Sequence, residues 1–383
     1  MKIKNKIGLL SIVTILILAV LLPCQTLSVD ATFDSSVHAK ASLLMDAKTG
    51  KVLVENNAYK HLPIASVTKL MTILITLEEI NQGNIATSDK IVVSENASGM
   101  GGSQIFLDGN QEYEIGQLLK SVIVCSANDS SVALAEHIAG SEQNFVKLMN
   151  EKAQSLGLNN TNYSNCTGLP SSEGYSCAYD QAIVLKIVLS HDLYHEYSSI
   201  WMEDFTHPSG RITQMTNTNK LSRFYDGCIG GKTGSTNQAK YCLAVGAERH
   251  NTQFISVVLG AENSKNRFAL ASELLNYGFA NYTNETIFSN ANLSDKSIKI
   301  KGSDKNIQLK AEREYSIVKE KNTPINFSIN YHLPNSLNRV KENDVVGTAE
   351  IIVDGIVVDT INILSCSTYS EPTVWDYFKE IIN

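Results

Sequence analysis

The chain has 383 residues, of which 43% are hydrophobic and 19% charged, so it is long enough for two domains and can bury a sizeable core. This composition excludes an intrinsically disordered protein. The formal net charge of -7 provides no basic surface, so we expect no nucleic-acid partner.

The N-terminus has the pattern of an export signal. Lys2, Lys4 and Lys6 precede an uncharged apolar run, and small residues allow cleavage after Ala31. We therefore expect residues 1–31 to be a signal peptide and the mature protein to act outside the cytoplasm. An uncleaved anchor is the alternative, because the apolar run approaches the about 18 residues that a membrane span needs.

The first elements of the mature chain form a predicted hairpin. Apolar runs lie on both sides of the tripeptide Lys48-Thr49-Gly50, and residues 46–50 have the residue types of a β-turn. Gly50 can take the positive φ that such a turn often requires. This first copy of the sequence KTG is therefore predicted to be a connection between strands and not part of a site.

An apolar helix is predicted over the sequence VTKLMTILITLEEI, with a serine and a lysine at its start. Ser66 and Lys69 are three residues apart, so their side chains lie on one face of the helix. A serine hydroxyl becomes a nucleophile when a base accepts its proton. A lysine can be that base when burial or a nearby cation lowers its pKa from about 10.4. We expect Ser66 to be the nucleophile and Lys69 the base.

Two further polar motifs follow in chain order. Ser126 and Asn128 supply a hydroxyl for proton relay and an amide that can hold a substrate peptide group. The sequence NFVKLMNEKAQSLGL after them predicts an amphipathic helix. The second copy of KTG, Lys232-Thr233-Gly234, adds a cation, a hydroxyl and a glycine that lets an extended ligand lie against a strand.

After residue 282 the pattern changes to short runs of alternating polarity, such as SIKIKG, IQLKAE and INFSINYHL. In the sequence AEIIVDGIVVDTINIL, Asp354-Gly355 is placed as a two-residue hairpin turn. We therefore expect a small all-β domain over residues 283–366.

The tail, residues 367–383, predicts an amphipathic C-terminal helix. Its apolar face would comprise Val374, Trp375, Phe378, Ile381 and Ile382. Its polar face carries more acidic than basic side chains, whereas interfacial helices usually attract anionic lipid through Lys and Arg. We expect at most a loose, peripheral membrane contact, and packing on the β domain is the alternative.

The six cysteines of the mature chain neither form a dense disulfide framework nor show a C-x-x-C zinc pattern. We expect small buried side chains rather than disulfides. Cys125 adjoins Ser126, and we interpret it as a packing residue because no histidine partner is evident. The six are Cys125, Cys166, Cys177, Cys228, Cys242 and Cys366.

The motifs S-x-x-K, S-x-N and K-T-G, in this order, are the signature of penicillin-binding proteins and serine β-lactamases. The segment from Gly101 to Pro170 and the sequence GYSCAYDQAIVL closely resemble the low-molecular-mass D-alanyl-D-alanine carboxypeptidases, and the resemblance covers essentially the whole mature chain. It implies an α+β fold, with a β-lactamase/transpeptidase-like catalytic domain over residues 32–282. That domain would have an antiparallel sheet flanked by helices and a helical lobe, with the site between them.

The resemblance implies a serine-type carboxypeptidase that removes the terminal D-alanine from peptidoglycan pentapeptides through an acyl-enzyme, without a cofactor, and is inhibited by β-lactams. Backbone N–H groups of Ser66 and Ser235 would hold the oxyanion, while Ser126 and Lys232 would relay the proton to the leaving amine. The protein would act at the outer face of the cytoplasmic membrane or in the cell wall. Candidates for binding the substrate carboxylate are Lys232, Thr233, Thr236 and Arg267.

Two positions depart from the family pattern. Lys240 replaces a common glycine, and Ser235 occupies a position where some members have histidine. Both positions line the predicted substrate groove, so the sequence determines the chemistry better than the substrate preference.

Three other functions have less support in the sequence. A common β-lactamase would carry E-x-x-L-N between Asn128 and Lys232, and none occurs. A zinc peptidase could use His191 and His195, but no third ligand is evident. A non-catalytic penicillin-binding or wall-binding protein has no need of an activated nucleophile such as Ser66.

Overall fold

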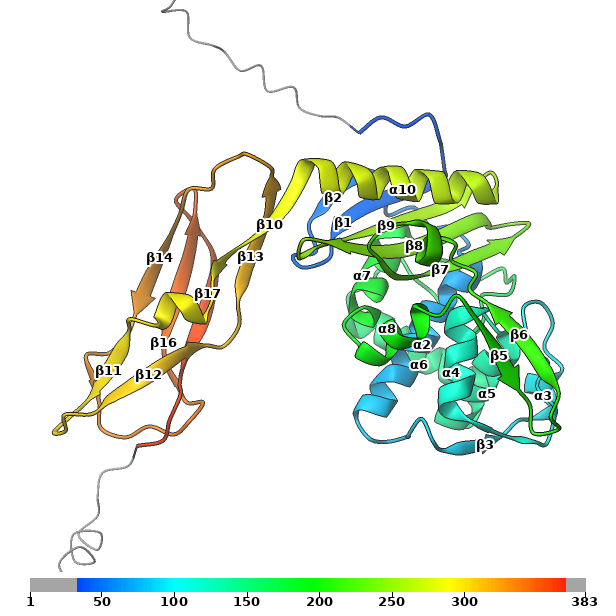
Figure 1. Cartoon of the computed structure of the whole chain (residues 1–383), viewed down its shortest axis with the longest axis horizontal. Helices are drawn as coiled ribbons and strands as arrows, with labels where there is room; N and C mark the ends of the chain where they lie inside the picture. The colour runs from blue at the N-terminus through cyan, green and yellow to red at the C-terminus, as the bar shows by residue number, and fades with distance from the viewer. Residues whose placement is uncertain (1–32, 370–383) are drawn as a thin grey trace, which may run out of the picture. The chain divides into compact units, whose positions relative to one another are not determined.

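The computed structural model describes residues 33–369 of the chain (Figure 1). The predicted signal peptide, residues 1–31, lies outside the described residues, as does the tail from residue 370 onward. Within the described part of the chain, no helix is both long enough and apolar enough to cross a membrane.

A five-stranded antiparallel sheet supports the predicted site. Its strands are β1 (Ala41–Asp46), β2 (Val52–Asn56), β7 (Cys228–Thr236), β8 (Lys240–Arg249) and β9 (Thr252–Ala261). They lie in the order β2-β1-β9-β8-β7, which makes β7 an edge strand. Strands β8 and β9 are almost continuously buried, because α10 (Ser264–Asn281) covers one face of the sheet and α7 (Ala178–Val188) the other (Figure 1).

A helical lobe packs against this sheet. Its helices are η1 (Ala65–Thr68), α2 (Lys69–Asn81), α3 (Glu95–Ser98), α4 (Ile115–Val124), α5 (Asn128–Ala139), α6 (Glu142–Ser155), α8 (Asp192–Ser198) and α9 (Leu221–Phe224). It also holds two short hairpins, β3 (Lys90–Val92) with β4 (Glu112–Glu114) and β5 (Met202–Thr206) with β6 (Ile212–Thr216).

The apolar helix predicted after Ser66 is α2, at the centre of the lobe. Every residue from Lys69 to Leu77 is buried, because α4, α5, α6 and α7 surround the helix. The predicted amphipathic helix is α6. It buries Phe145, Met149 and Ala153, which are spaced four residues apart on one face. Both helix predictions are confirmed.

The first KTG copy is a turn, as predicted. Strands β1 and β2 pair antiparallel, and Lys48-Thr49-Gly50 lies in their connection. The Asp46 carboxylate accepts hydrogen bonds from the backbone N–H and the hydroxyl of Thr49, at 2.7 and 2.6 Å. Gly50 has a φ of +76°, which explains the glycine at the end of the turn.

The last part of the described chain is built from strands, as predicted. They are β10 (Tyr282–Phe288), β11 (Ser297–Ile300), β12 (Asn306–Ala311), β13 (Tyr315–Glu320), β14 (Phe327–His332), β15 (Ser336–Leu337), β16 (Val345–Val353) and β17 (Ile356–Ser365), with the short helix η2 (Asn290–Leu293). Six of these strands form one sheet, in the order β14-β16-β17-β12-β11-β15. Asp354 and Gly355, with φ of +48° and +80°, form the predicted two-residue turn between β16 and β17. The α+β fold is confirmed.

Candidate active site

Ser66 and Lys69 meet where η1 passes into α2. The Lys69 Nζ atom lies 3.1 Å from Ser66 Oγ and 2.6 Å from both Asn128 Oδ1 and the carbonyl oxygen of Thr167. A neutral amine has two hydrogens, which suit the two carbonyl oxygens, and one lone pair, which is then left for the serine hydroxyl. The geometry therefore suits a base that accepts the proton of Ser66.

Burial gives Lys69 the right basicity for this task. The side chain is fully buried, and desolvation lowers its pKa from 10.5 to about 7. Lys232 is also buried, and desolvation followed by the charge of Lys69 lowers its pKa well below the usual value. A neutral Lys69 is thus accessible near pH 7, which an exposed lysine would not be.

Ser126 lies between α4 and α5 in a conformation that non-glycine residues seldom adopt. Its φ is +68°, and its hydroxyl accepts a 2.7 Å hydrogen bond from Lys232 Nζ. Such backbone strain persists where surrounding structure holds it, and it is concentrated at functional sites. The strained turn and β7 together bring the S-x-N and K-T-G motifs into contact.

Asn128 begins α5, and both polar atoms of its side-chain amide form hydrogen bonds within the protein. Its Oδ1 accepts from Lys69, and its Nδ2 donates to the Gly101 carbonyl at 2.7 Å. Its backbone N–H donates to the Ser103 carbonyl at 2.7 Å. The sequence indicated a substrate amide contact for Asn128, and the structure adds a contact with the predicted base.

Gly234 lets strand β7 approach the predicted nucleophile. A Cβ atom at this position would lie 2.8 Å from the backbone nitrogen of Ser66 and 2.7 Å from the carbonyl oxygen of Ile64. Any side chain here would push β7 away from η1. The sequence predicted that this glycine makes room for a ligand, and the structure adds that it makes room for the backbone of Ser66.

The other substrate-binding candidates on β7 differ in exposure. Lys232 and Thr233 are buried, Thr236 is partly buried and Ser235 is exposed. Since β7 is an edge strand, an extended ligand can pair with its outer backbone groups.

The fold places Arg267, on α10, in contact with β7. Its Nη1 donates to the carbonyl oxygens of Gly234 and Cys242 at 3.1 and 3.2 Å, and the residue is 8% exposed. Its Nε has no hydrogen-bond partner among the described residues. In this structure Arg267 therefore joins β7 to β8 at the K-T-G motif.

Lys240 adopts a backbone conformation that favours glycine, the residue that the family resemblance predicts at this position. It begins β8, pairs with Thr236 across the three-residue loop between β7 and β8, and has a φ of +57°. Glycine adopts this conformation freely, while a side chain pays a steric cost. The departure from the family pattern thus places strain at the end of the β7–β8 hairpin.

The loop that supplies Thr167 was not identified from the sequence. Asn165 Oδ1 accepts from the backbone N–H groups of Thr167 and Gly168, at 3.1 and 2.6 Å, which fixes the turn. Gly168 has a φ of +78°, and a Cβ there would lie 2.0 Å from the Ala65 carbonyl oxygen. Asn165 and Gly168 are typical turn residues, so the sequence could have predicted the turn. No local pattern, however, related this turn to Lys69.

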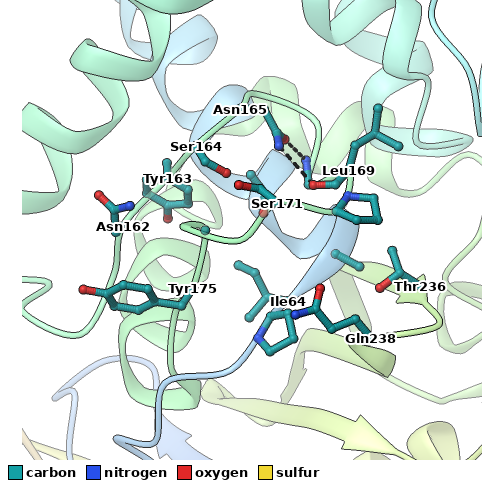
Figure 2. Close-up of a pocket in the computed structure, with 16 residues that line it drawn as sticks. Ile64, Asn162, Tyr163, Ser164, Asn165, Leu169, Ser171, Tyr175, Thr236 and Gln238 are labelled. Carbon is teal, nitrogen blue, oxygen red and sulfur yellow. Dashed lines mark hydrogen bonds between the residues drawn. The ribbon is translucent and has the colours of Figure 1, made fainter.

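A pocket lies between this loop and the end of β7 (Figure 2). Ile64, Asn165, Leu169, Tyr175, Thr236 and Gln238 are among its lining residues. None of the lining side chains is charged, so the pocket suits an uncharged group of a ligand bound along β7.

The cysteines lie in environments that differ in exposure. Burial raises the pKa of Cys125 to about 12, so its thiol stays protonated at neutral pH. Cys166, Cys177 and Cys242 are buried and Cys125 and Cys228 partly buried, but Cys366 is exposed, against expectation.

The ring nitrogens of His195 lie 2.7 and 3.2 Å from backbone carbonyl oxygens. Among residues 33–369, no group of three or more His, Cys, Asp or Glu side chains could hold a metal ion.

Comparison with known proteins identifies two matching families. Residues 27–263 match the peptidase S11 family, described as D-alanyl-D-alanine carboxypeptidase, and residues 282–371 match the C-terminal domain of penicillin-binding protein 5.

Individual relatives agree with this match. The chain is 39% identical over 296 residues to the D-alanyl-D-alanine carboxypeptidase DacF of Bacillus subtilis (strain 168), covering 77% of this chain and 76% of the relative. It is 31% identical over 355 residues to DacA of Haemophilus influenzae, another D-alanyl-D-alanine carboxypeptidase, covering 89% and 88%. The solved structure of penicillin-binding protein 5 from Haemophilus influenzae superposes with a TM-score of 0.72 at 31% identity, covering 89% of this chain and 100% of that chain.

Proposed function

Because the chain belongs to the D-alanyl-D-alanine carboxypeptidase family, we propose that Ser66 is the nucleophile of its reaction and that Lys69 is the base. The family's activity is removal of the terminal D-alanine from peptidoglycan stem peptides through an acyl-enzyme, and penicillin inhibits it by forming an acyl-enzyme of its own. The observation that carries the assignment is the 3.1 Å contact between Ser66 Oγ and the fully buried Lys69 Nζ.

Acylation begins with the transfer of the Ser66 hydroxyl proton to Lys69 as Oγ attacks the carbonyl carbon of the penultimate D-alanine. The backbone N–H groups of Ser66 and Ser235 stabilise the negative charge that develops on the carbonyl oxygen. The proton is passed through the hydroxyl of Ser126, which is hydrogen-bonded to Lys232, to the leaving nitrogen. The peptide bond breaks, and free D-alanine departs.

Deacylation uses the same groups. Water attacks the ester carbon of the acyl-enzyme, loses one proton to the site, and the Ser66 oxygen recovers a proton as the bond to the shortened peptide breaks. The partners of Lys69 help in both steps, because Asn128 Oδ1 and the Thr167 carbonyl keep the amine oriented toward Ser66.

The substrate lies along β7 in this proposal. Thr233, Ser235 and Thr236 offer hydroxyls and Lys232 and Arg267 offer cations for the terminal carboxylate, while Gly234 keeps the strand close to Ser66. This arrangement is supported by the edge position of β7 and by the direct contact of Arg267 with the Gly234 carbonyl.

We extend the proposal to the organisation of the whole chain. Residues 1–31 form a signal peptide, 32–282 the catalytic domain, 283–366 the β domain and 367–383 a tail that makes at most a loose, peripheral membrane contact, with packing on the β domain as the alternative. Export to the outer face of the membrane or the wall is supported by the lysine-led apolar N-terminus and by the substrate of the family.

The test is incubation of the purified mature protein with a pentapeptide that ends in D-Ala-D-Ala. Released D-alanine should equal the shortened peptide formed, and the Ser66→Ala variant should release none. Release at the same rate by the variant would contradict the role of Ser66 but leave the family activity in place.

A further inference from the structure

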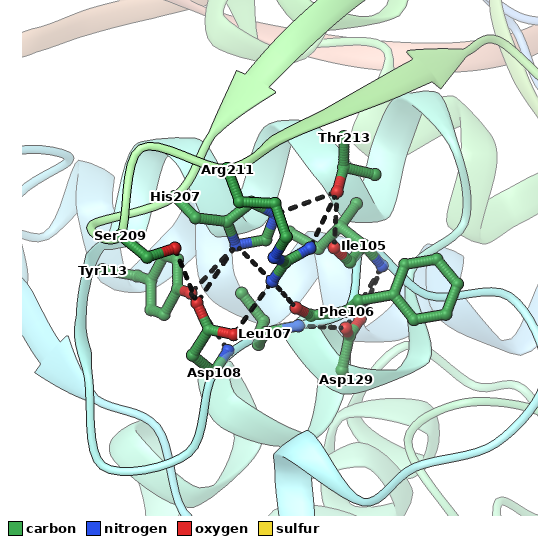
Figure 3. A network of polar contacts seen from close by, with 10 residues as sticks. All are labelled: Ile105, Phe106, Leu107, Asp108, Tyr113, Asp129, His207, Ser209, Arg211 and Thr213. Atoms are coloured by element: carbon green, nitrogen blue, oxygen red, sulfur yellow. Dashed lines mark hydrogen bonds and ion pairs between the residues drawn. The ribbon is translucent and has the colours of Figure 1, made fainter.

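The loop between α3 and β4, residues 99–111, is held by the N-terminus of α5. Asn128 bonds to the carbonyl oxygens of Gly101 and Ser103, as described above. The next residue, the buried Asp129, accepts hydrogen bonds from the backbone N–H groups of Ile105 and Leu107, each at 3.1 Å from Oδ2 (Figure 3). The loop is therefore attached to the same turn of helix that contacts Lys69.

The hairpin of β5 and β6 holds the other side of this loop (Figure 3). Arg211 Nη2 donates to Asp108 Oδ1 at 3.0 Å and also to the carbonyl oxygen of Phe106. Thr213 Oγ1 donates to the carbonyl oxygen of Ile105 at 3.2 Å. Arg211 thus binds a side chain and a backbone group of the loop through one guanidinium nitrogen, Nη2.

Phe106, between these two attachments, has a strained backbone. Its φ is +62°, in a region that bulky residues rarely occupy, and 57% of the residue is exposed. The ring points away from the polar network in Figure 3, so packing there does not offset the strain. Phe106 is held in this conformation by contacts that include those of Ile105 and Leu107 with Asp129, of Ile105 with Thr213 and of its own carbonyl with Arg211.

We propose that Arg211 is a positioning residue for acylation: it holds the 99–111 loop in the strained conformation that keeps Asn128 against Lys69. This inference rests on the proposed roles of Ser66 and Lys69. Without Arg211, Phe106 relaxes toward negative φ, and the Gly101 and Ser103 carbonyls move away from Asn128. The Asn128 amide then loses its orientation toward Lys69, and the base is no longer aimed at the serine.

The test measures acylation by a fluorescent penicillin in the purified mature chain. Arg211→Gln should lower the acylation rate constant at saturating penicillin by about tenfold, because it disturbs the reacting geometry and not the amount of folded enzyme. The matched control is Arg313→Gln, which removes another partly exposed arginine paired with an aspartate, Asp359, at 2.8 Å. The acylation rate constant of this control should stay within about twofold of that of the unaltered chain.

A second variant separates positioning from simple destabilisation. Glycine adopts positive φ freely, so Phe106→Gly should make the loop conformation independent of Arg211. The acylation rate constant of the double variant Phe106→Gly with Arg211→Gln should therefore lie within about threefold of that of Phe106→Gly alone. The final stoichiometry of bound penicillin counts the folded chains in every sample. If Arg211→Gln lowers this stoichiometry, Asp108→Asn is tested in its place. Its acylation rate constant should likewise fall by about tenfold and be restored by Phe106→Gly.

The outcomes are distinct. Equal acylation rates for Arg211→Gln and Arg313→Gln, or a slow rate that Phe106→Gly does not restore, would overturn the positioning role. Failure of the unaltered chain to bind penicillin, or binding that persists in Ser66→Ala, would instead overturn the proposed function of Ser66.

Discussion

Lys69 Nζ lies 3.1 Å from Ser66 Oγ, and this contact is made by a lysine with no exposed surface. The burial matters as much as the distance, since it is desolvation that lowers the pKa of Lys69 to about 7. The remaining two contacts of the amine, to Asn128 and Thr167, fix its direction. Each of these features leads to an experiment.

Ser66 should be the residue that penicillin acylates. Mass spectrometry of a digest after penicillin treatment should find the adduct on the peptide that contains Ser66, because this hydroxyl contacts the buried amine. The Ser66→Ala variant should carry no adduct. An adduct on Ser126, whose hydroxyl contacts Lys232, would reverse the assignment.

Acylation should rise with pH through about 7. The base acts in its neutral form, and the neutral fraction of Lys69 grows as the pH passes its pKa of about 7. The rate constant should therefore increase about tenfold per pH unit below pH 6 and level off above pH 8. Stopped-flow measurement with a fluorescent penicillin gives the profile.

A permanently charged side chain at this position provides the companion test. Lys69→Arg should lower the acylation rate constant by at least about 100-fold at pH 8, the usual contribution of a general base. Near-normal acylation in this variant would transfer the base role to another group.

Gly168→Ala should damage both stability and acylation. Its Cβ would lie 2.0 Å from the Ala65 carbonyl oxygen, so the Thr167 loop has to move away from Lys69. We expect a loss of about 2 to 4 kcal/mol in the free energy of unfolding, measured with urea. The control is Gly157→Ala, which has a similar φ of +71° but nothing within 4 Å, and should lose only about 1 kcal/mol. Equal losses would show that the close approach to Ala65 is unimportant.

Lys240→Gly should stabilise the protein slightly. It relieves a φ of +57° at a cost in unfolded-chain entropy, for a net gain of about 0.5 kcal/mol in the free energy of unfolding. Lys60, an exposed lysine without positive φ, is the control, and Lys60→Gly should lose about 0.5 kcal/mol. A loss in both variants would mean that the Lys240 side chain makes a contribution larger than its strain.

The C-terminal tail should hold the protein to membranes only loosely. Cells that express the full chain are fractionated beside cells that express a chain stopped after Cys366. Because the polar face of the tail has a net negative charge and so attracts anionic lipid little, the full chain should be released into the soluble fraction almost as completely as the shortened one. Salt-resistant retention of the full chain alone would show that the tail is a true anchor.

Local patterns in the sequence were sufficient for much of the architecture. The buried helix α2, the turn at Lys48-Thr49-Gly50 and the Asp354-Gly355 hairpin depend on periodicity and turn chemistry, which act within a few residues. The pairing of Ser66 with Lys69 also follows from helical spacing, because one turn of helix brings residues three apart onto one face.

The sequence by itself therefore determined the residue types of the site and the elements that carry them, while tertiary structure decided their environment. The Thr167 carbonyl reaches Lys69 across 98 residues of chain, Lys232 reaches Ser126 across 106, and Arg211 reaches Asp108 across 103. No local pattern encodes such contacts, since they depend on how sheet, lobe and loops pack together. The same packing removes water from Lys69, and without that desolvation the lysine would remain a charged group instead of a base.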